Sequence, residues 1–172
     1  MAICFDLEIS FLNVEYDLQL FLEQLAPTIK PFKNIDFHPL KNSFITVDGP
    51  YQGQLSVTPK NVGMGVSFDD DAPYHDVDDE EALKLSLHMY EFIRGLPEYQ
   101  MALVGWELGF LSNYLKHDQA GQVVEVAAIE GLVVANELFE KVKDSSRWIN
   151  FDSRHKWIPC ESQIGNMFGD DE

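Results

Sequence analysis

The chain contains little cysteine: Cys4 and Cys160 are the only two among 172 residues. Two cysteines cannot build a disulfide framework, and cysteine-based metal sites use close pairs that this sequence lacks. We therefore expect no metal and no cofactor. A single bridge between Cys4 and Cys160 is one open alternative. The preferred alternative is two free thiols, which pack in proteins as small hydrophobic residues.

Positive charge is also scarce, with 12 lysines and arginines against 29 aspartates and glutamates and a formal net charge of −17. Binding to nucleic acid or to an anionic membrane surface needs clustered lysine and arginine. A strongly acidic surface instead favours solubility and rapid association with a basic protein. We expect a basic protein partner, no nucleic acid and no membrane.

Long hydrophobic runs are missing as well, because no segment approaches the roughly 20 apolar residues that a membrane-spanning helix needs. The first ten residues lack the basic start of a secretory signal, and Asp6 and Glu8 interrupt their apolar pattern. These features predict a cytoplasmic protein. Its 12 phenylalanines, 6 tyrosines and 3 tryptophans argue against a disordered chain.

Motifs for nucleophilic catalysis and phosphate binding are missing too: the chain has no G-x-S-x-G and no G-x-x-x-x-G-K-[ST] segment. Its five histidines are scattered, without the close spacing of a zinc site. Residues 151–155 combine acid, hydroxyl, cation and base, and we interpret them as a polar hairpin turn. Glu107, in an apolar stretch, is the best candidate for a carboxylate with a raised pKa. We assign no catalytic residue.

What the chain does have is a concentration of acid between Asp69 and Glu81, where eight of thirteen residues carry a carboxylate. Three interpretations are open: a solvated loop leading into an acidic first helical turn, a docking surface for a basic partner, or a cation site. A calcium-loop pattern fails, because Tyr74 stands where the sharp turn requires glycine. The predicted partner-binding residues of this run are Asp69, Asp70, Asp71, Asp76, Asp78, Asp79 and Glu80.

Two tryptophans extend the predicted partner-binding set. Trp148 and Trp157 lie beside Arg147, Arg154 and Lys156, the only locally basic patch in the sequence. Tryptophan and arginine are enriched in binding hot spots. The alternative is that the two indoles pack across the strands of a hairpin.

Hydrophobic periodicity predicts the elements of the first half of the chain. Residues 2–10 alternate apolar and polar side chains, as in a half-buried strand, and 13–25 have helical spacing. Short β-rich runs separated by turn residues then predict an antiparallel meander. Its strands are expected at 43–47, 54–58 and 65–68, with a turn at Gly63.

After the meander, Asp78 and Glu81 have the spacing of a capping box, which predicts a helix that ends at Gly95. Residues 101–117 allow a helix or a buried strand, and we favour the helix. A further helix is expected within 122–143.

The last elements are two short strands within 148–158 and a polar tail. The chain is therefore predicted to be a single α+β domain over residues 1–164, with an acidic C-terminal tail at 165–172. In this fold an N-terminal strand and helix precede the meander. Helices then pack on one face of the sheet, and the short C-terminal strands close it.

Charge and size together predict a non-enzymatic interaction protein. An immunity or inhibitor protein that neutralises a basic partner, such as a nuclease toxin, fits them. One alternative is a small hydrolase that uses carboxylates such as Glu107 or those of 76–80 at the junction of helix and sheet. Another is a structural subunit of an oligomer.

Overall fold

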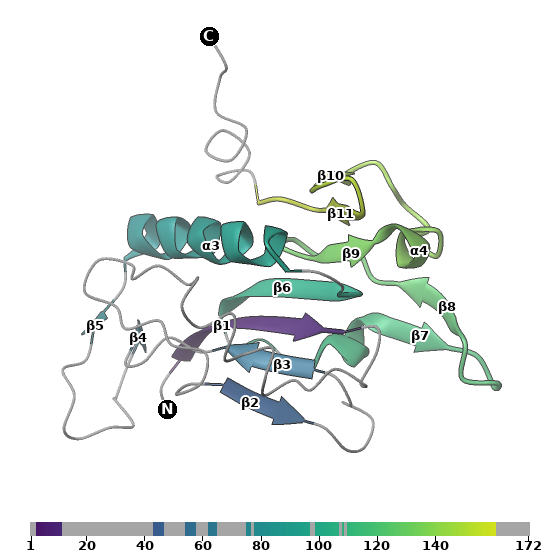
Figure 1. Ribbon diagram of the computed structural model, residues 1–172, viewed down its shortest axis with the longest axis horizontal. Coiled ribbons are helices and arrows are strands. Elements are labelled where there is room, and N and C mark those ends of the chain that lie inside the picture. Colours follow the sequence, from purple (N-terminus) through teal and green to yellow (C-terminus); the bar gives the residue numbers. More distant parts are fainter. Residues whose placement is uncertain are drawn as a thin grey trace, which may run out of the picture.

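The computed structural model describes residues 3–11, 43–46, 54–57, 62–64, 75–76, 78–96, 99–106, 108 and 110–160. Antiparallel strands and a few helices make up these residues, which confirms the predicted α+β class (Figure 1). The predicted helix at 13–25, the predicted strand at 65–68 and the predicted tail at 165–172 lie outside the described residues.

The main sheet has the strand order β10-β11-β9-β6-β1-β3-β2, and each neighbouring pair in this order is antiparallel. Two more strands join beside β1: β4 pairs with β1, and β5 pairs with β4 in the parallel direction. The bounds are β1 (Ile3–Ser10), β2 (Ser43–Thr46), β3 (Gln54–Val57), β4 (Val62–Met64), β5 (His75–Asp76), β6 (Met101–Trp106), β9 (Val133–Ala135), β10 (Ile149–Asn150) and β11 (His155–Trp157).

β1 lies between β3 and β6 in this sheet. Its register with β6 places Leu7 opposite Val104 and Ile9 opposite Ala102. Successive side chains of a strand point to opposite faces, so these four residues share one face of the sheet. All four are buried. The alternating pattern of the sequence therefore located this strand and its inner face correctly.

Helix α3 (Asp79–Arg94) runs along the sheet and covers this face (Figure 1). The Asp78 side chain accepts a hydrogen bond from the backbone N–H of Glu81 at 2.8 Å, so the predicted N-cap is confirmed. The helix ends at Gly95, as the sequence predicts. Its buried stripe consists of Ala82, Leu85, Ser86, Met89, Tyr90 and Ile93.

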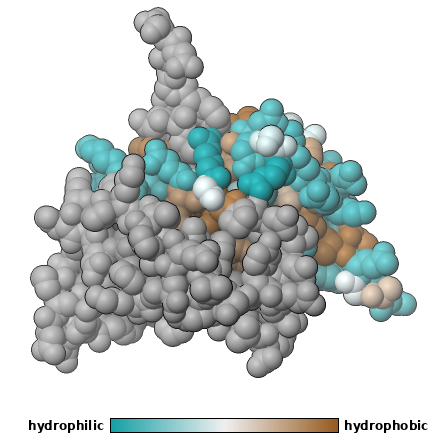
Figure 2. All heavy atoms as spheres, viewed as in Figure 1, coloured by the Kyte–Doolittle hydropathy of each residue, from teal (hydrophilic) through white to brown (hydrophobic). Residues whose placement is uncertain are grey.

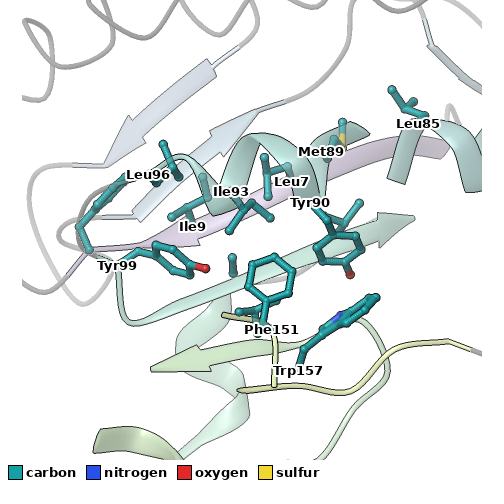
Figure 3. Close-up of a cluster of buried hydrophobic side chains, with 14 of the residues drawn as sticks. Leu7, Ile9, Leu85, Met89, Tyr90, Ile93, Leu96, Tyr99, Phe151 and Trp157 are labelled. Atoms are coloured by element: carbon teal, nitrogen blue, oxygen red, sulfur yellow. The ribbon is translucent and has the colours of Figure 1, made fainter. Parts of the chain in front are cut away.

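The first hydrophobic core lies between α3 and this sheet face, and the C-terminal hairpin contributes to it (Figure 3). The Tyr90 ring lies 4.9 Å from the Trp157 ring and 5.9 Å from the Phe151 ring, between centroids. The Tyr90 hydroxyl donates to the Gly131 carbonyl at 2.7 Å. The aromatic rings therefore join α3 to the C-terminal hairpin, and the buried hydrogen bond joins it to Gly131, just before β9.

A second hydrophobic core lies on the opposite face of the sheet, where Met101 and Leu103 alternate with the residues of the first core. Trp148 and Ile158 are buried in this second core. The elements that cover it are the 3₁₀ helix η2 (Leu111–Tyr114), the two-stranded sheet of β7 (Leu115–His117) with β8 (Val123–Val126), and the short helix α4 (Asn136–Phe139).

The predicted helix at 101–117 is wrong. Residues 101–106 form β6, which is followed by η2 and β7. Both faces of β6 are covered, so Met101 to Val104 are all buried. A strand buried on both faces has a continuous apolar pattern that periodicity cannot separate from that of a buried helix.

The predicted helix within 122–143 is confirmed only for four residues, and the rest of that segment is not helical. Its residues form β8, β9 and the four-residue helix α4. Gly131 has φ +85°, a left-handed conformation that ends any helix at this point. The predicted turn at Gly63 is wrong as well, because Val62–Met64 is strand β4.

Two further predictions of secondary structure are confirmed. β2 and β3 form an antiparallel pair within the predicted meander. β10 and β11 form the predicted closing hairpin around the turn at 152–154. Among the helices that the structure describes, none is both long and apolar enough to cross a membrane.

The position of Gly131 generates a testable prediction. A β-carbon there would lie 3.0 Å from the Tyr90 hydroxyl and 3.1 Å from the Val104 carbonyl. Gly121 has a similar φ of +78°, but a β-carbon there would meet nothing within 4 Å. Gly121→Ala should lower the free energy of unfolding by about 1–2 kcal/mol through backbone strain alone. Gly131→Ala should cost roughly 1–3 kcal/mol more, because it also crowds the core. Urea unfolding measures both free energies, and equal losses in the two variants would contradict the close contact of Gly131 with the core.

The packing of the hairpin generates a second prediction. Truncation after Lys143 removes Phe151 and Trp157 from the first core and Trp148 from the second. Each loss of a buried aromatic side chain costs about 3–5 kcal/mol, and a domain is stable by only about 5–15 kcal/mol. We expect the truncated protein to lose cooperative thermal unfolding, while deletion of residues 165–172 leaves it unchanged. Cooperative melting of the first variant near the full-length temperature would show the hairpin to be an appendage.

Candidate functional site

The predicted acidic surface is described only in part. Asp69, Asp70 and Asp71 lie outside the described residues. Asp76 belongs to β5, where its backbone is opposite Gly63 of β4. Asp78, Asp79 and Glu80 are exposed at the start of α3. The structure therefore places the last three of these carboxylates together at one end of the helix.

The carboxylates at this helix start have different local roles. Asp78 caps the helix, as described above. Glu80 pairs with Lys84 one turn later, and this contact raises the pKa of Lys84. Both partners are largely exposed, and such pairs contribute little to stability. Asp78 is therefore needed to cap α3, whereas Asp79 has no comparable structural role.

The two predicted partner-binding tryptophans are buried. Trp157 is 0% exposed and packs between Tyr90 and Phe151, and Trp148 is 8% exposed and packs edge-on against Phe139. Their apolar character is thus explained by packing in the two cores. We leave them out of the surface proposed below.

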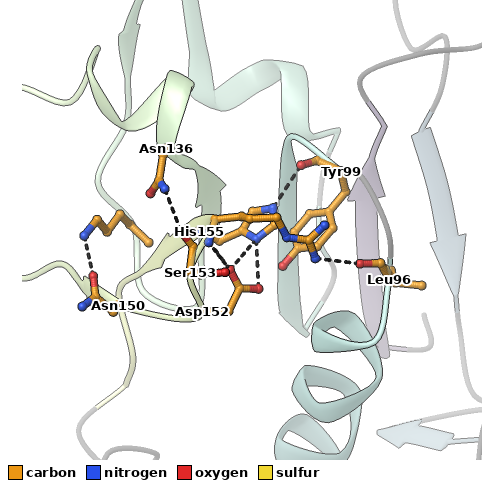
Figure 4. Close-up of polar contacts among 9 residues, drawn as sticks. Leu96, Tyr99, Asn136, Asn150, Asp152, Ser153 and His155 are labelled. Atoms are coloured by element: carbon orange, nitrogen blue, oxygen red, sulfur yellow. Dashed lines mark hydrogen bonds and ion pairs between the residues drawn. The ribbon is translucent and has the colours of Figure 1, made fainter.

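Around the turn at 152–154, residues that are close in the sequence also contact one another in the structure (Figure 4). One oxygen of Asp152 accepts from the backbone N–H groups of Arg154 and His155, at 2.6 and 2.9 Å. Nδ1 of His155 lies 3.0 Å from both carboxylate oxygens. Burial alone would raise the pKa of Asp152, but these hydrogen bonds outweigh it and hold that pKa below its usual range.

His155 also contacts the segment that follows α3. Its ring is stacked on the Tyr99 ring, with centroids 4.0 Å apart and planes 4° from parallel. Its Nε2 lies 3.2 Å from the Tyr99 carbonyl oxygen. Nearby, Arg154 donates to the Leu96 carbonyl at 3.1 Å, and Arg94 lies over the Phe151 ring. The interpretation of residues 151–155 as a hairpin turn is correct, and this turn is fastened to the end of α3.

Tyr99 adds a buried hydroxyl to this region. Its hydroxyl is buried and has no hydrogen-bond partner among the described residues. Burial and the charge of Asp152 raise the pKa of this hydroxyl, and Arg154 and Arg94 act in the opposite direction. The hydroxyl therefore stays protonated at any physiological pH.

Sequence reasoning missed Glu8, which it placed on the solvent face of β1. Glu8 is only 5% exposed, because the second face of the sheet is also covered. The Gln54 amide donates to its carboxylate at 2.7 Å, and the Gln54 carbonyl accepts from the Leu111 backbone N–H at 3.2 Å. Leu111 thus orients the amide that holds Glu8. The alternation of residues 2–10 could not reveal this, because it does not say whether the polar face meets water.

Reactive cysteine and metal chemistry find no support in the described part of the chain. Burial together with the neighbouring Glu130 raises the pKa of the Cys160 thiol, which disfavours the nucleophilic thiolate. No group of His, Cys, Asp and Glu that could hold a metal ion occurs among the described residues. Glu107 and the Cys4 side chain are outside the described part.

Comparison with protein-family models, with curated proteins and with solved structures finds no match to this chain.

The lowered pKa of Asp152 generates a prediction for acid stability. A carboxylate whose pKa is lower in the folded state stabilises the fold above its unfolded pKa, and this stabilisation is lost as the pH falls through the folded-state pKa. Asp152→Asn should reduce the free energy of unfolding by about 1–3 kcal/mol at neutral pH, because it replaces a charged acceptor that serves the backbone N–H groups of Arg154 and His155. The loss should shrink as the pH is lowered below about 4. Urea unfolding of both proteins measures this difference, and a loss independent of pH would contradict it.

Proposed function

We propose that this chain is a non-enzymatic acidic protein that binds and neutralises a basic protein partner, in the manner of an immunity or inhibitor protein against a nuclease toxin. The observation that carries the proposal is the net charge of −17, with eight carboxylates concentrated before and within the first turn of α3.

The exposure of the described carboxylates supports this proposal. Asp79 and Glu80 face solvent at the start of α3, and the helix needs Asp78 alone for its cap. On the face shown in Figure 2, hydrophilic residues cover much of the described surface. Acid that local structure does not need is free to interact with a partner, and long-range attraction by such charge raises association rates more than it raises affinity.

The geometry of the polar centre between α3 and the hairpin does not favour a hydrolase site at Asp152 and His155, a pair that the alternative based on Glu107 and residues 76–80 does not include. Asp152 and His155 bind each other and the backbone, and His155 is only 2% exposed. A general base must reach a proton on the substrate. A buried imidazole whose two nitrogens already face protein oxygens is poorly placed to do so, which supports a structural role for this pair.

A charge-neutralising variant tests the proposal on a panel of purified basic nuclease toxin domains. Asp69, Asp70, Asp71 and Asp79 are changed to Asn, and Asp78 is retained because it caps α3. Association rates are measured by surface plasmon resonance at low and high salt, together with nuclease inhibition. We expect the wild-type chain to inhibit at least one domain stoichiometrically. The variant should associate at least about tenfold more slowly at low salt and with weaker salt dependence.

A matched control separates the location of the charge from its total. Glu91, Asp118, Glu137 and Glu140 are exposed residues elsewhere on the chain, and their change to Gln or Asn removes the same four charges. This control should retain most of the wild-type association rate. Equal slowing by both variants would show that only total charge matters and would contradict a surface at the start of α3. Failure to inhibit any basic nuclease domain would contradict the nuclease-toxin partner.

A further inference from the structure

The elements that cover the second core carry apolar side chains that remain half-buried. The sheet of β7 and β8, helix α4 and residues 140–143 form one layer over this core, the outer layer. The backbone N–H of Val126 donates to the Lys141 carbonyl at 3.4 Å, which joins β8 to the segment after α4. Figure 2 shows hydrophobic residues at the surface where Figure 1 places β7 and β8. The half-buried apolar residues of the outer layer are Leu115, Val123, Leu138, Phe139 and Val142.

Val124 adds a largely exposed apolar side chain to the outer layer. It is 49% exposed, and it lies next to the half-buried Val123. Lys116 is opposite Glu125 and His117 is opposite Val123, so Val124 is the extra residue of a β-bulge. A single exposed valine is ordinary on a protein surface, but this one continues a group of half-buried apolar residues. Such a group, with polar residues around it, is typical of an interaction surface.

Charge is nearly balanced in the part of the chain that contains the outer layer. Residues 110–160 contain six lysines and arginines against seven aspartates and glutamates, whereas residues 69–107 contain two against eleven. Within the layer, Glu125 pairs with Lys143 at 2.6 Å and with Lys116 at 3.1 Å. Charges of both signs therefore surround the apolar residues, as in the polar rim of a protein interface.

The distribution of charge decides which partner fits the outer layer. A basic protein is attracted to the acidic start of α3, which lies at the opposite end of the molecule from β7 and β8 (Figure 1). A second copy of this chain is repelled, because each copy has a net charge of −17. This repulsion is smallest when the two outer layers face each other, since the two acidic helix starts are then far apart.

We infer that the outer layer is the contact surface of a symmetric dimer of this chain. In a two-fold dimer the same surface of both copies takes part, so Val124 of each copy packs against the outer layer of the other. The contact removes this valine and its half-buried apolar neighbours from water. The acidic start of α3 stays accessible in both copies, and the dimer forms without any basic partner.

Sedimentation of the full-length wild-type protein tests the dimer by analytical ultracentrifugation from about 10 µM to about 1 mM, the range of weak association. Salt screens the repulsion between two acidic copies and leaves the burial of apolar surface favourable. The dimerisation constant should therefore rise about tenfold between about 0.05 and 0.5 M sodium chloride. Contact between the helix start of one copy and the lysines of another would instead weaken with salt. A dimer weakened by salt, or a monomer under all these conditions, would overturn the inference.

Val124→Asp tests the contact surface, because the dimer would bury two carboxylates that lack partners. It should lower the dimerisation constant at least about tenfold at high salt. Lys84→Gln is the matched control, since it changes the net charge by the same one unit at an exposed site on α3, and it should dimerise as the wild type does. Thermal unfolding checks that both variants fold.

A second variant keeps the test valid if Val124→Asp does not fold. Val124→Thr retains the shape of the side chain and should weaken the dimer about fivefold, because one methyl group per copy becomes a hydroxyl. An unchanged dimerisation constant in the folded Val124 variants, or an equal loss in Lys84→Gln, would overturn the outer layer as the contact. None of these measurements uses a basic partner, so their outcome is independent of the proposed function.

Discussion

The burial of both faces of the β1–β6 pair is the constraint on which the described structure depends. β6 presents Ala102 and Val104 to α3 and presents Met101 and Leu103 to the second core. Each layer that covers the pair is therefore needed to keep apolar surface from water. This requirement explains why the ribbon of β7 and β8, the short helix α4 and the C-terminal hairpin all pack against the sheet, although the chain as a whole is strongly acidic.

Aromatic packing links these layers across long distances in sequence. Tyr90 of α3 contacts Phe151 and Trp157 of the hairpin, and its hydroxyl binds the Gly131 carbonyl. Several polar groups of the same interior are hydrogen-bonded in pairs, as with Glu8 and Gln54 or Asp152 and His155. The other carboxylates whose exposure is described lie wholly or partly at the surface. A net charge of −17 acts on association and solubility and has little influence on the fold.

The sequence by itself determined the elements whose signals are local. The alternation of residues 2–10 located β1, the Asp78 to Glu81 spacing located the start of α3, and Gly95 located its end. The turn at 152–154 and the exposed acid at the start of α3 were also readable, because capping, turn formation and charge depend on residues close together in the chain. The excess of acid that carries the proposed function is likewise a property of composition alone.

Some features depend on which elements cover a surface, and only the tertiary structure decided these. Residues 101–106 are a strand because they pair with β1 and are buried on both sides, and an apolar run of this kind looks the same in a buried helix. Glu8 is inside and the two C-terminal tryptophans pack in cores because elements distant in sequence cover them. The Tyr99–His155 contact joins residues 56 positions apart. No local pattern encodes a contact between residues so far apart in the sequence. Such a contact forms because the folded chain brings distant surfaces together to exclude water.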